Sequence, residues 1–315
     1  MSDRSCNICN AGGPEIVAEE AEIRSNVRAF AHERFGVWRC KRCDSLHARD
    51  EADLPFYYAR YPFHDIPDNF ANRVLSYHLL GRLKRAGLKP EHRVLDYGCG
   101  GGNFVKFLRA RGYDHVVGFD EYSQEFGDKS VLAHTYDCVL SQDVIEHVDS
   151  PHELLREFER LVAPGGIIAV GTPNASAISL SDSERTVHAL HLPYHRHILS
   201  KQALLAVAEP HGWQLVEYYP TQYANTPAPF LNSMFYLYYM RLMDNSLDAI
   251  VEASKVPRVA PLLLRLPLTL FWGLFGYFFA PETDVMAIFK RPGAAPALNA
   301  GQPPRANRPE AQPRP

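Results

Sequence analysis

The sequence predicts an α/β fold with a doubly wound parallel sheet, and three observations support this prediction. Short apolar strands alternate with helical patterns between about residues 67 and 220, which is typical of βαβ units. A strand at residues 93–96 runs directly into a glycine-rich loop and then into a helix. A β-rich segment at 285–289 supplies a last strand.

The individual elements follow from apolar spacing and from residues that mark helix ends. Pro67 and Pro151 are expected at helix starts, where a missing N–H is tolerated, and Ser200 is expected to cap the next helix. Residues 164–166 are expected to end the helix that begins at Pro151. We predict helices at 67–86, 103–111, 151–161 and 201–208, and further strands at 115–119, 136–140, 167–170 and 213–219.

Composition divides the chain into five segments. Cysteine pairs mark an N-terminal module, and an unusually aromatic, apolar stretch interrupts the α/β pattern before its last strand. The tail is rich in Pro, Ala, Gly, Asn and Arg, and we expect it to be disordered. The segments are a zinc-binding module at 1–62, a core at 63–220, a helical cap insertion at 221–282, a last core strand at 283–290 and a tail at 291–315.

Length and charge limit the function classes. A chain of 315 residues with 46% hydrophobic residues suits one large domain with an accessory module. Its net charge of −3 disfavours a dedicated nucleic-acid-binding protein, whose surface is usually basic. The first residues, MSDRSCNICN, show no basic stretch followed by an apolar one, so we expect no secretory signal and a reducing, cytoplasmic location.

The glycine loop indicates the ligand. Residues 94–104 read VLDYGCGGGNF, which gives the pattern D-x-G-x-G-x-G. A dinucleotide fingerprint would require glycine where Asn103 stands. The acid before the loop, Asp96, would repel a pyrophosphate and attract a cation, and S-adenosylmethionine (SAM) carries a sulfonium and an ammonium group. Asp120 ends the second strand, where a carboxylate can accept hydrogen bonds from ribose hydroxyls.

These motifs resemble those of the class I, Rossmann-like SAM-dependent methyltransferases. VLDYGCGGGNF is similar to their first motif and GFDEY to their second, and residues 136–174 resemble the segment after the cofactor site, above all in ubiquinone-type O-methyltransferases. The resemblance covers roughly residues 70–220. It implies that the methionine part of SAM binds at the loop and that the ribose binds at Asp120. It also implies that Gln142 and Asp143, which follow the third strand, lie along the cofactor. The implied cofactor-binding residues are Asp96, Gly98, Cys99, Gly100, Gly102, Asp120, Gln142 and Asp143.

One stretch departs from the family pattern. Only residues 121–135 separate the second and third strands, where the family usually has a helix, a strand and an acidic loop that contacts adenine. We therefore expect a shortened adenine site, with Tyr122 or Phe126 as a stacking partner.

Four cysteines predict a zinc site. Cys6 and Cys9, and Cys40 and Cys43, form two C-x-x-C pairs that are 30 residues apart. Four thiolates suit a closed, structural Zn²⁺ site, and two pairs are more than a redox centre needs. The module, followed by FYYARYPF, resembles the zinc-binding N-terminal regions of sugar C-methyltransferases. A nucleic-acid-binding role is the alternative.

Candidate catalytic residues lie in two segments. Tyr194-His195-Arg196-His197 resembles the Y-H-E-H segment of the sugar C-methyltransferases, which implies roles for Tyr194 and His197 although Arg196 replaces the glutamate. His147 follows the third strand, close to the expected position of the transferred methyl group. Histidine suits a general base near neutral pH, but both segments also suit plain loop packing.

The apolar insertion allows three interpretations. Residues 266–280 carry no charge, but they are too few for a membrane span, and the strand at 285–289 must return to the sheet. The segment is a cap over a hydrophobic substrate, a peripheral membrane contact through 259–280, or a core-packing insertion.

The sequence therefore predicts SAM-dependent methyl transfer to a small molecule, with preference for a hydrophobic acceptor such as a lipid, an isoprenoid or a polyketide-like compound. A sugar C-methyltransferase is one alternative. Alternatives of other classes are a nicotinamide-dependent oxidoreductase, which the glycine spacing disfavours, and a zinc-dependent nucleic-acid-binding protein with a degenerate methyltransferase domain, which the charge disfavours.

Overall fold

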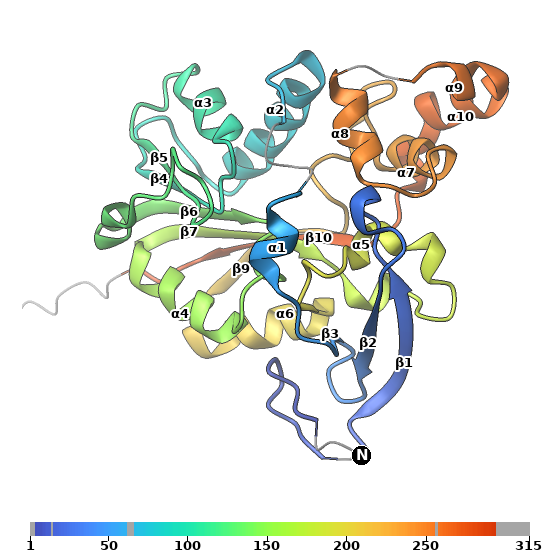
Figure 1. Ribbon diagram of the computed structural model, residues 1–315. Helices are drawn as coiled ribbons and strands as arrows, with labels where there is room; N and C mark the ends of the chain where they lie inside the picture. The colour runs from blue at the N-terminus through green and yellow to red at the C-terminus, as the bar shows by residue number, and fades with distance from the viewer. Residues whose placement is uncertain (1–3, 14, 62–65, 256–257, 294–315) are drawn as a thin grey trace, which may run out of the picture.

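The computed structural model describes residues 4–13, 15–61, 66–255 and 258–293. Its centre is a six-stranded sheet in the order β5–β4–β6–β7–β10–β9 (Figure 1). The first four of these strands are parallel, and β10 runs antiparallel to both of its neighbours. The strands are β4 (Val94–Tyr97), β5 (Val116–Phe119), β6 (Tyr136–Gln142), β7 (Val162–Pro173), β9 (Gln214–Tyr219) and β10 (Asp284–Lys290).

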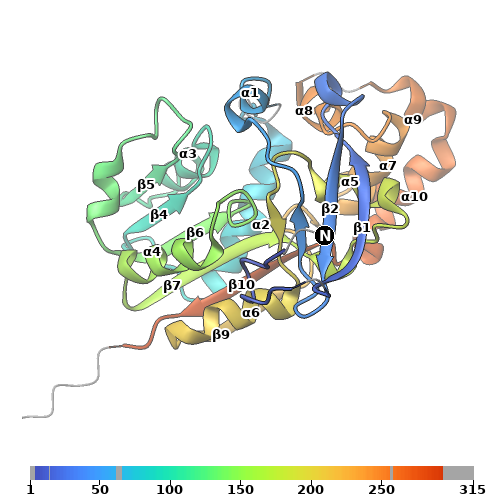
Figure 2. The ribbon, with the colours of Figure 1, turned by 60° about the horizontal axis from the view of Figure 1, so that its bottom comes forward.

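Helices cover both faces of this sheet, as the sequence predicted. α2 (Phe70–Arg85) and α3 (Asn103–Arg109) lie on one face, and α4 (Pro151–Leu161) and α6 (Lys201–Ala208) lie on the other (Figures 1 and 2). Leu83 of α2 and Leu108 of α3 are fully buried in one apolar cluster, while Phe158 of α4 belongs to a second one. The doubly wound α/β class is therefore confirmed.

One predicted helix start was wrong, and the segment predicted to follow the helix at 151–161 as its end signal lies inside a strand. α2 begins at Phe70 rather than at Pro67, because the side chain of Asn69 accepts a hydrogen bond from the Asn72 amide and caps the helix there. The segment 164–166 does not end a helix, since β7 already begins at Val162. That segment forms an irregularity in the pairing of β7 with β6, and the Gly165 amide donates to the carbonyl of Arg291 just after β10.

A second, antiparallel sheet of four strands lies beside the core in the order β1–β2–β3–β8. Three of these strands come from the first 48 residues, but β8 comes from the segment that follows β7. Leu46 and His47 of β3 pair with Ile198 and His197 of β8. The cysteine-containing region therefore shares a sheet with a strand from the second half of the chain. The strands are β1 (Val17–Arg24), β2 (Arg34–Cys40), β3 (Leu46–Ala48) and β8 (His197–Ile198).

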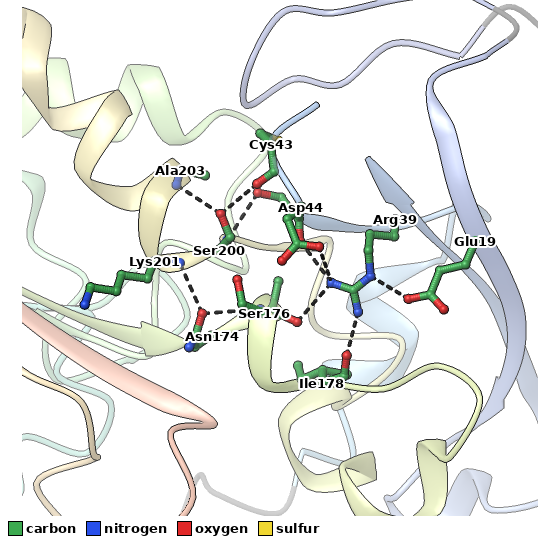
Figure 3. A network of polar contacts seen from close by, with 12 residues as sticks. Glu19, Arg39, Cys43, Asp44, Asn174, Ser176, Ile178, Ser200, Lys201 and Ala203 are labelled. Carbon is green, nitrogen blue, oxygen red and sulfur yellow. Dashed lines mark hydrogen bonds and ion pairs between the residues drawn. The ribbon is translucent and has the colours of Figure 1, made fainter. Parts of the chain in front are cut away.

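A polar network fixes this second sheet to the core (Figure 3). The guanidinium of Arg39, in β2, donates to the carbonyl oxygens of Ala175 and Ile178, which follow β7. Ser200 Oγ donates to the Cys43 carbonyl at 2.7 Å and accepts from the Ala203 amide, so it joins the cysteine loop to α6. These bonds are buried or partly buried, which makes the loss of either side chain costly.

The insertion between β9 and β10 is helical and lies to one side of the sheet, beside α5 (Figure 1). Within the part of the chain that the structure describes, none of the helices combines the length and apolar character that a membrane crossing requires. The expected tail falls, from residue 294 on, outside the described residues. The helices are α7 (Ser233–Leu242), α8 (Asp248–Lys255), α9 (Ala260–Leu264), α10 (Leu266–Phe275) and the 3₁₀ turn η7 (Gly276–Phe279), with α1 (Leu54–Tyr58), α5 (Val187–Leu190) and η3 (Lys129–Ala133) elsewhere.

Candidate active site

The loop after β4 adopts a backbone that only glycine tolerates well. Gly98, Gly100 and Gly102 have φ of +78°, +53° and +70°. A Cβ on Gly98 would lie 2.2 Å from Cγ2 of Val144. The loop, including Cys99, lines a cavity, so a ligand there can approach the backbone closely.

Gly98→Ala is expected to weaken SAM binding by about tenfold or more, because its Cβ would displace Val144, which also lines the cavity, and shift the loop backbone that meets the ligand. Isothermal titration with SAM measures this effect. Gly112→Ala is the matched control, since Gly112 also has positive φ (+80°) but open space around it. Equal SAM affinity in both variants would contradict a cofactor role for the loop.

Four carboxyl groups gather where the strands end. Asp96 is buried in β4, and burial, with the nearby charge of Asp120, raises its pKa to about 7. Asp143 lines the cavity and its side chain is exposed there, but desolvation by the surrounding protein and the nearby charge of Asp284 raise its pKa to about 7. The Asp120 carboxylate accepts hydrogen bonds from the amides of Gly100 and Tyr122, at 2.9 and 3.0 Å. A group of acids that lines one part of a cavity favours a positively charged ligand there.

Asp284 is a member of this group that the sequence analysis did not select. It opens β10, the strand inserted between β7 and β9, and burial raises its pKa to about 6. An acid at the start of an otherwise apolar strand was the available signal. Only the sheet order shows that this end of β10 meets the end of β7, since Asp284 pairs with Pro173.

The carboxyl groups and the glycine loop form one end of a cavity of about 1620 Å³. The other end is lined by the insertion, including Phe230, Tyr236 and Tyr239. The volume exceeds that of a usual single-ligand pocket, so it suits a cofactor together with an acceptor molecule. Gln142 also lines the cavity, and its side-chain amide donates to the carbonyl of Ser141.

The segment between β5 and β6 is short, as the sequence predicted. That segment holds the turn η3 and no strand, so β5 is an edge strand. Phe126 packs beneath the glycine loop, where a Cβ on Gly102 would lie 2.2 Å from its ring, so this ring is not available for stacking on a ligand. Tyr122 lines the cavity, is 61% exposed and stacks on Tyr58 with ring centroids 4.8 Å apart.

Glu146, His147 and His195 form a polar cluster on the cavity wall. One ligand atom from each lies within 4.8 Å of the others, and His195 Nε2 is 3.9 Å from Glu146 Oε1. The other carboxyl oxygen of Glu146 accepts from the Thr172 hydroxyl. Burial lowers the pKa of His147 to about 4 and that of His195 well below its usual value, whereas burial raises the pKa of Glu146. Both imidazoles are therefore neutral at pH 7 and can accept a proton.

The other two predicted catalytic residues lie behind this cluster. His197 is a β8 residue whose Nε2 is 2.8 Å from the Ile145 carbonyl oxygen, and neither it nor Tyr194 is among the cavity-lining residues. The Tyr194 hydroxyl donates to the Tyr57 carbonyl, and the Tyr194 carbonyl oxygen lies 3.1 Å from His147 Nδ1. The same segment instead brings His195 to the cavity. The sequence motif indicated this segment but not which of its histidines lines the cavity.

The four cysteines converge as the zinc prediction requires. Cys6, Cys9, Cys40 and Cys43 place their sulfur atoms within 4.8 Å of one another, with Sγ–Sγ distances of 3.6 Å for Cys6–Cys43 and 3.7 Å for Cys9–Cys40. A tetrahedron with Zn–S bonds of about 2.3 Å has edges of about 3.8 Å, so the set fits Zn²⁺. His47, which the sequence analysis did not select, lies with Nε2 3.2 Å from Cys6 Sγ and stacks on Trp38.

Comparisons with known proteins agree with this geometry. The sequence model of a methyltransferase-domain family matches residues 70–218. The ubiquinone biosynthesis O-methyltransferase of Yersinia pestis is 31% identical over 119 residues, which cover 31% of this chain and 49% of that protein. The chain thus spans about half the length of the curated relatives it matches. The family match covers residues 70–218 and supports a class I SAM-dependent methyltransferase domain in this part of the chain.

Two methyltransferases are among the solved structures that align with this chain. The N-methyltransferase NodS from Bradyrhizobium japonicum, in complex with S-adenosyl-L-homocysteine, aligns over 76% of this chain and all of its own, with 13% identity and a TM-score of 0.42. A SAM-dependent methyltransferase from Mesorhizobium loti aligns over 67% of this chain and 96% of its own, with 16% identity and a TM-score of 0.40.

Proposed function

We propose that this protein transfers the methyl group of SAM to a hydrophobic small molecule. One observation carries the proposal: a single cavity joins an acidic, glycine-lined end to an end walled by aromatic and aliphatic side chains of the insertion. The first end suits a cationic cofactor, and the second suits an apolar acceptor. The acceptor is of the lipid, isoprenoid or polyketide-like kind.

The residues at the acidic end fit SAM. The Asp96 carboxylate would pair with the cofactor's ammonium group, and the amides of the glycine loop would contact its methionine part. Asp120 would accept hydrogen bonds from the ribose, and Gln142 and Asp143 would lie along the cofactor. When bound, SAM supplies an electrophilic methyl group.

The polar cluster would serve the acceptor. SAM, when bound, would supply the methyl group to the acceptor's reacting atom and leave as S-adenosylhomocysteine, and His147, neutral and on the cavity wall, would take the proton that the acceptor loses. His195 and Glu146 are further candidates for contact with the acceptor. We assign Tyr194 and His197 a positioning role, because they hold the backbone behind this cluster.

The cysteine module would hold a structural Zn²⁺. Its four ligands leave no open coordination position, so it would stabilise β2, β3 and β8 rather than take part in chemistry. We place residues 1–62 and 221–282 as accessory units around a catalytic core at 63–220 and 283–290. Four thiolates also suit a reducing compartment such as the cytoplasm.

The test uses SAM labelled on its methyl group. Purified protein is incubated with labelled SAM and an extract of the source cells, and the label is followed into organic, aqueous and macromolecular fractions. Label in the organic phase is the expected result. Label in the aqueous fraction alone would replace the hydrophobic acceptor by a polar one such as a sugar. Label in nucleic acid or protein would overturn the small-molecule assignment.

His147→Asn is expected to lower kcat by about 10²–10⁴-fold, because a positioned general base contributes that much, while SAM affinity stays within about twofold. Steady-state kinetics on the acceptor identified above and SAM titration measure the two effects separately. His134→Asn is the control, since His134 is exposed and outside the cavity. An unchanged kcat would show that His147 is not the general base, and His195 would then be the next candidate.

A further inference from the structure

Large apolar side chains gather on the outside of the insertion. Of the eighteen exposed large apolar residues in the described part of the chain, eleven lie within 259–279. Leu264 is 86% exposed and Phe278 is 76% exposed. Single exposed apolar residues are common on protein surfaces, but a contiguous patch of this size is rare. Such a patch therefore indicates a binding surface. The outer face comprises Val259, Leu263, Leu264, Leu266, Leu268, Leu270, Phe271, Leu274, Phe275, Phe278 and Phe279.

The orientation of α10 explains why these side chains face outward. Its buried residues are Thr269 and Gly273, and the next buried residue is Gly276 of η7. A Cβ on Gly273 would lie 2.2 Å from the ring of Phe230. The helix α10 therefore packs against the protein through the face that carries its small residues. The side-chain amide of Asn232 donates to the Gly273 carbonyl and holds this arrangement. An insertion that served core packing would bury the large residues instead.

The charge of this segment favours one kind of partner. Residues 258–281 contain two arginines, Arg258 and Arg265, and no Asp or Glu, although the whole chain has a net charge of −3. Arg258 forms an ion pair with Glu252 at 3.2 Å, so the charge argument depends mainly on Arg265. Arginines beside an apolar, aromatic-rich face are typical of helices that lie in the interface of an anionic bilayer. Trp272 and Tyr277 lie in the same segment, and these residue types favour the level of lipid headgroups.

We infer that the outer face of α9, α10 and η7 binds the surface of an anionic lipid bilayer. The segment lies on the membrane and does not cross it, since α10 has only 10 residues and β10 must return to the sheet. The same insertion walls the apolar end of the cavity through Tyr239, Ile250 and Leu262. If the proposed function holds, docking brings that end of the cavity beside the lipid phase, from which a hydrophobic acceptor would enter.

The test measures binding to vesicles without SAM or acceptor, so its outcome is independent of the proposed function. Wild-type protein is sedimented with sucrose-loaded vesicles of phosphatidylcholine with a quarter phosphatidylglycerol, and with phosphatidylcholine alone. We expect sedimentation with the anionic vesicles, weakened by salt. The double variant Leu264→Glu, Phe278→Glu is expected to lose binding by at least about tenfold, because two inserting side chains become charged. Both positions are highly exposed, so the variant should fold, which circular dichroism checks.

Phe70→Glu is the matched control, because Phe70 is 78% exposed but lies at the start of α2, away from this face. It should bind vesicles like the wild type. Wild-type protein that stays in the supernatant with both vesicle types would overturn the inference. So would a double variant that still sediments. A wild-type dimer in light scattering that the double variant converts to a monomer, without vesicle binding, would assign the face to a second copy of the chain instead.

Discussion

Asp96→Asn is expected to abolish measurable SAM binding and, at the same time, to raise the thermal stability of the ligand-free protein. The Asp96 carboxyl group is buried, and its pKa rises from 3.8 to about 7 because of burial and the charge of Asp120. A folded-state pKa above the unfolded one means that folded-state stability falls as pH rises between these two values. At pH 8 the charged carboxylate therefore costs on the order of 3–5 kcal/mol, which the neutral amide removes.

The same pKa predicts how SAM affinity depends on pH. If the ammonium group of SAM needs the ionised Asp96, affinity is nearly full at about pH 8, half of that at the pKa of about 7, and falls further as the carboxyl group takes up a proton at lower pH. Between pH 8 and pH 6 the dissociation constant should rise about tenfold. Isothermal titration at three pH values and differential scanning calorimetry measure both effects.

Asp114→Asn is the control for these measurements, because Asp114 is exposed and lies outside the main cavity. Its SAM affinity and pH dependence should match the wild type. SAM affinity in Asp96→Asn within a few-fold of the wild type would show that the cofactor's ammonium group binds elsewhere, with Asp143 as the next candidate. Loss of SAM binding together with loss of stability would mean that the variant is misfolded.

The sequence predicted well those elements of the fold that depend on local residue patterns. α4 and α6 match their predicted bounds, because Ser150 and Ser200 cap them and their apolar residues repeat at helical spacing. The glycine loop was recognisable because three of its residues need left-handed backbone angles. The start of α2 was wrong by three residues, since Asn69 competes with Pro67 as a helix-start signal.

The parts that depend on distant pairing could not be predicted. β8 is a two-residue strand whose existence depends on its pairing with β3, about 150 residues earlier in the chain. This pairing turns His197 away from the cavity and, with the bond from the Arg196 amide to the Glu146 carbonyl, brings His195 toward it. The motif Y-H-x-H therefore located the right segment, while the choice between its histidines required the second sheet.

Cys40→Ser is expected to remove bound zinc and to lower methyl-transfer activity far more than SAM affinity. Cys40 is fully buried, and it shares an apolar cluster with Leu155 of α4 and Leu204 of α6, so the metal site is part of the core. Structural zinc contributes several kcal/mol or more to folding, so the unfolding temperature should fall by about 10 °C or more. Metal analysis by mass spectrometry and thermal unfolding measure these effects, and Cys99→Ser, outside the cluster, should keep one equivalent of zinc.

The separation of activity from SAM affinity follows from how the module reaches the cavity. Loss of the metal loosens β2 and β3, and β3 holds β8 in place through Leu46 and His47. The residues before β8 include His195, whereas the glycine loop follows β4, which pairs only with β5 and β6. We therefore expect kcat to fall by about 10²-fold or more while the SAM dissociation constant changes by less than about tenfold. If SAM affinity and activity fell together, the zinc module would support the whole domain rather than the acceptor side of the cavity. A full equivalent of zinc bound to Cys40→Ser would refute the four-cysteine site itself.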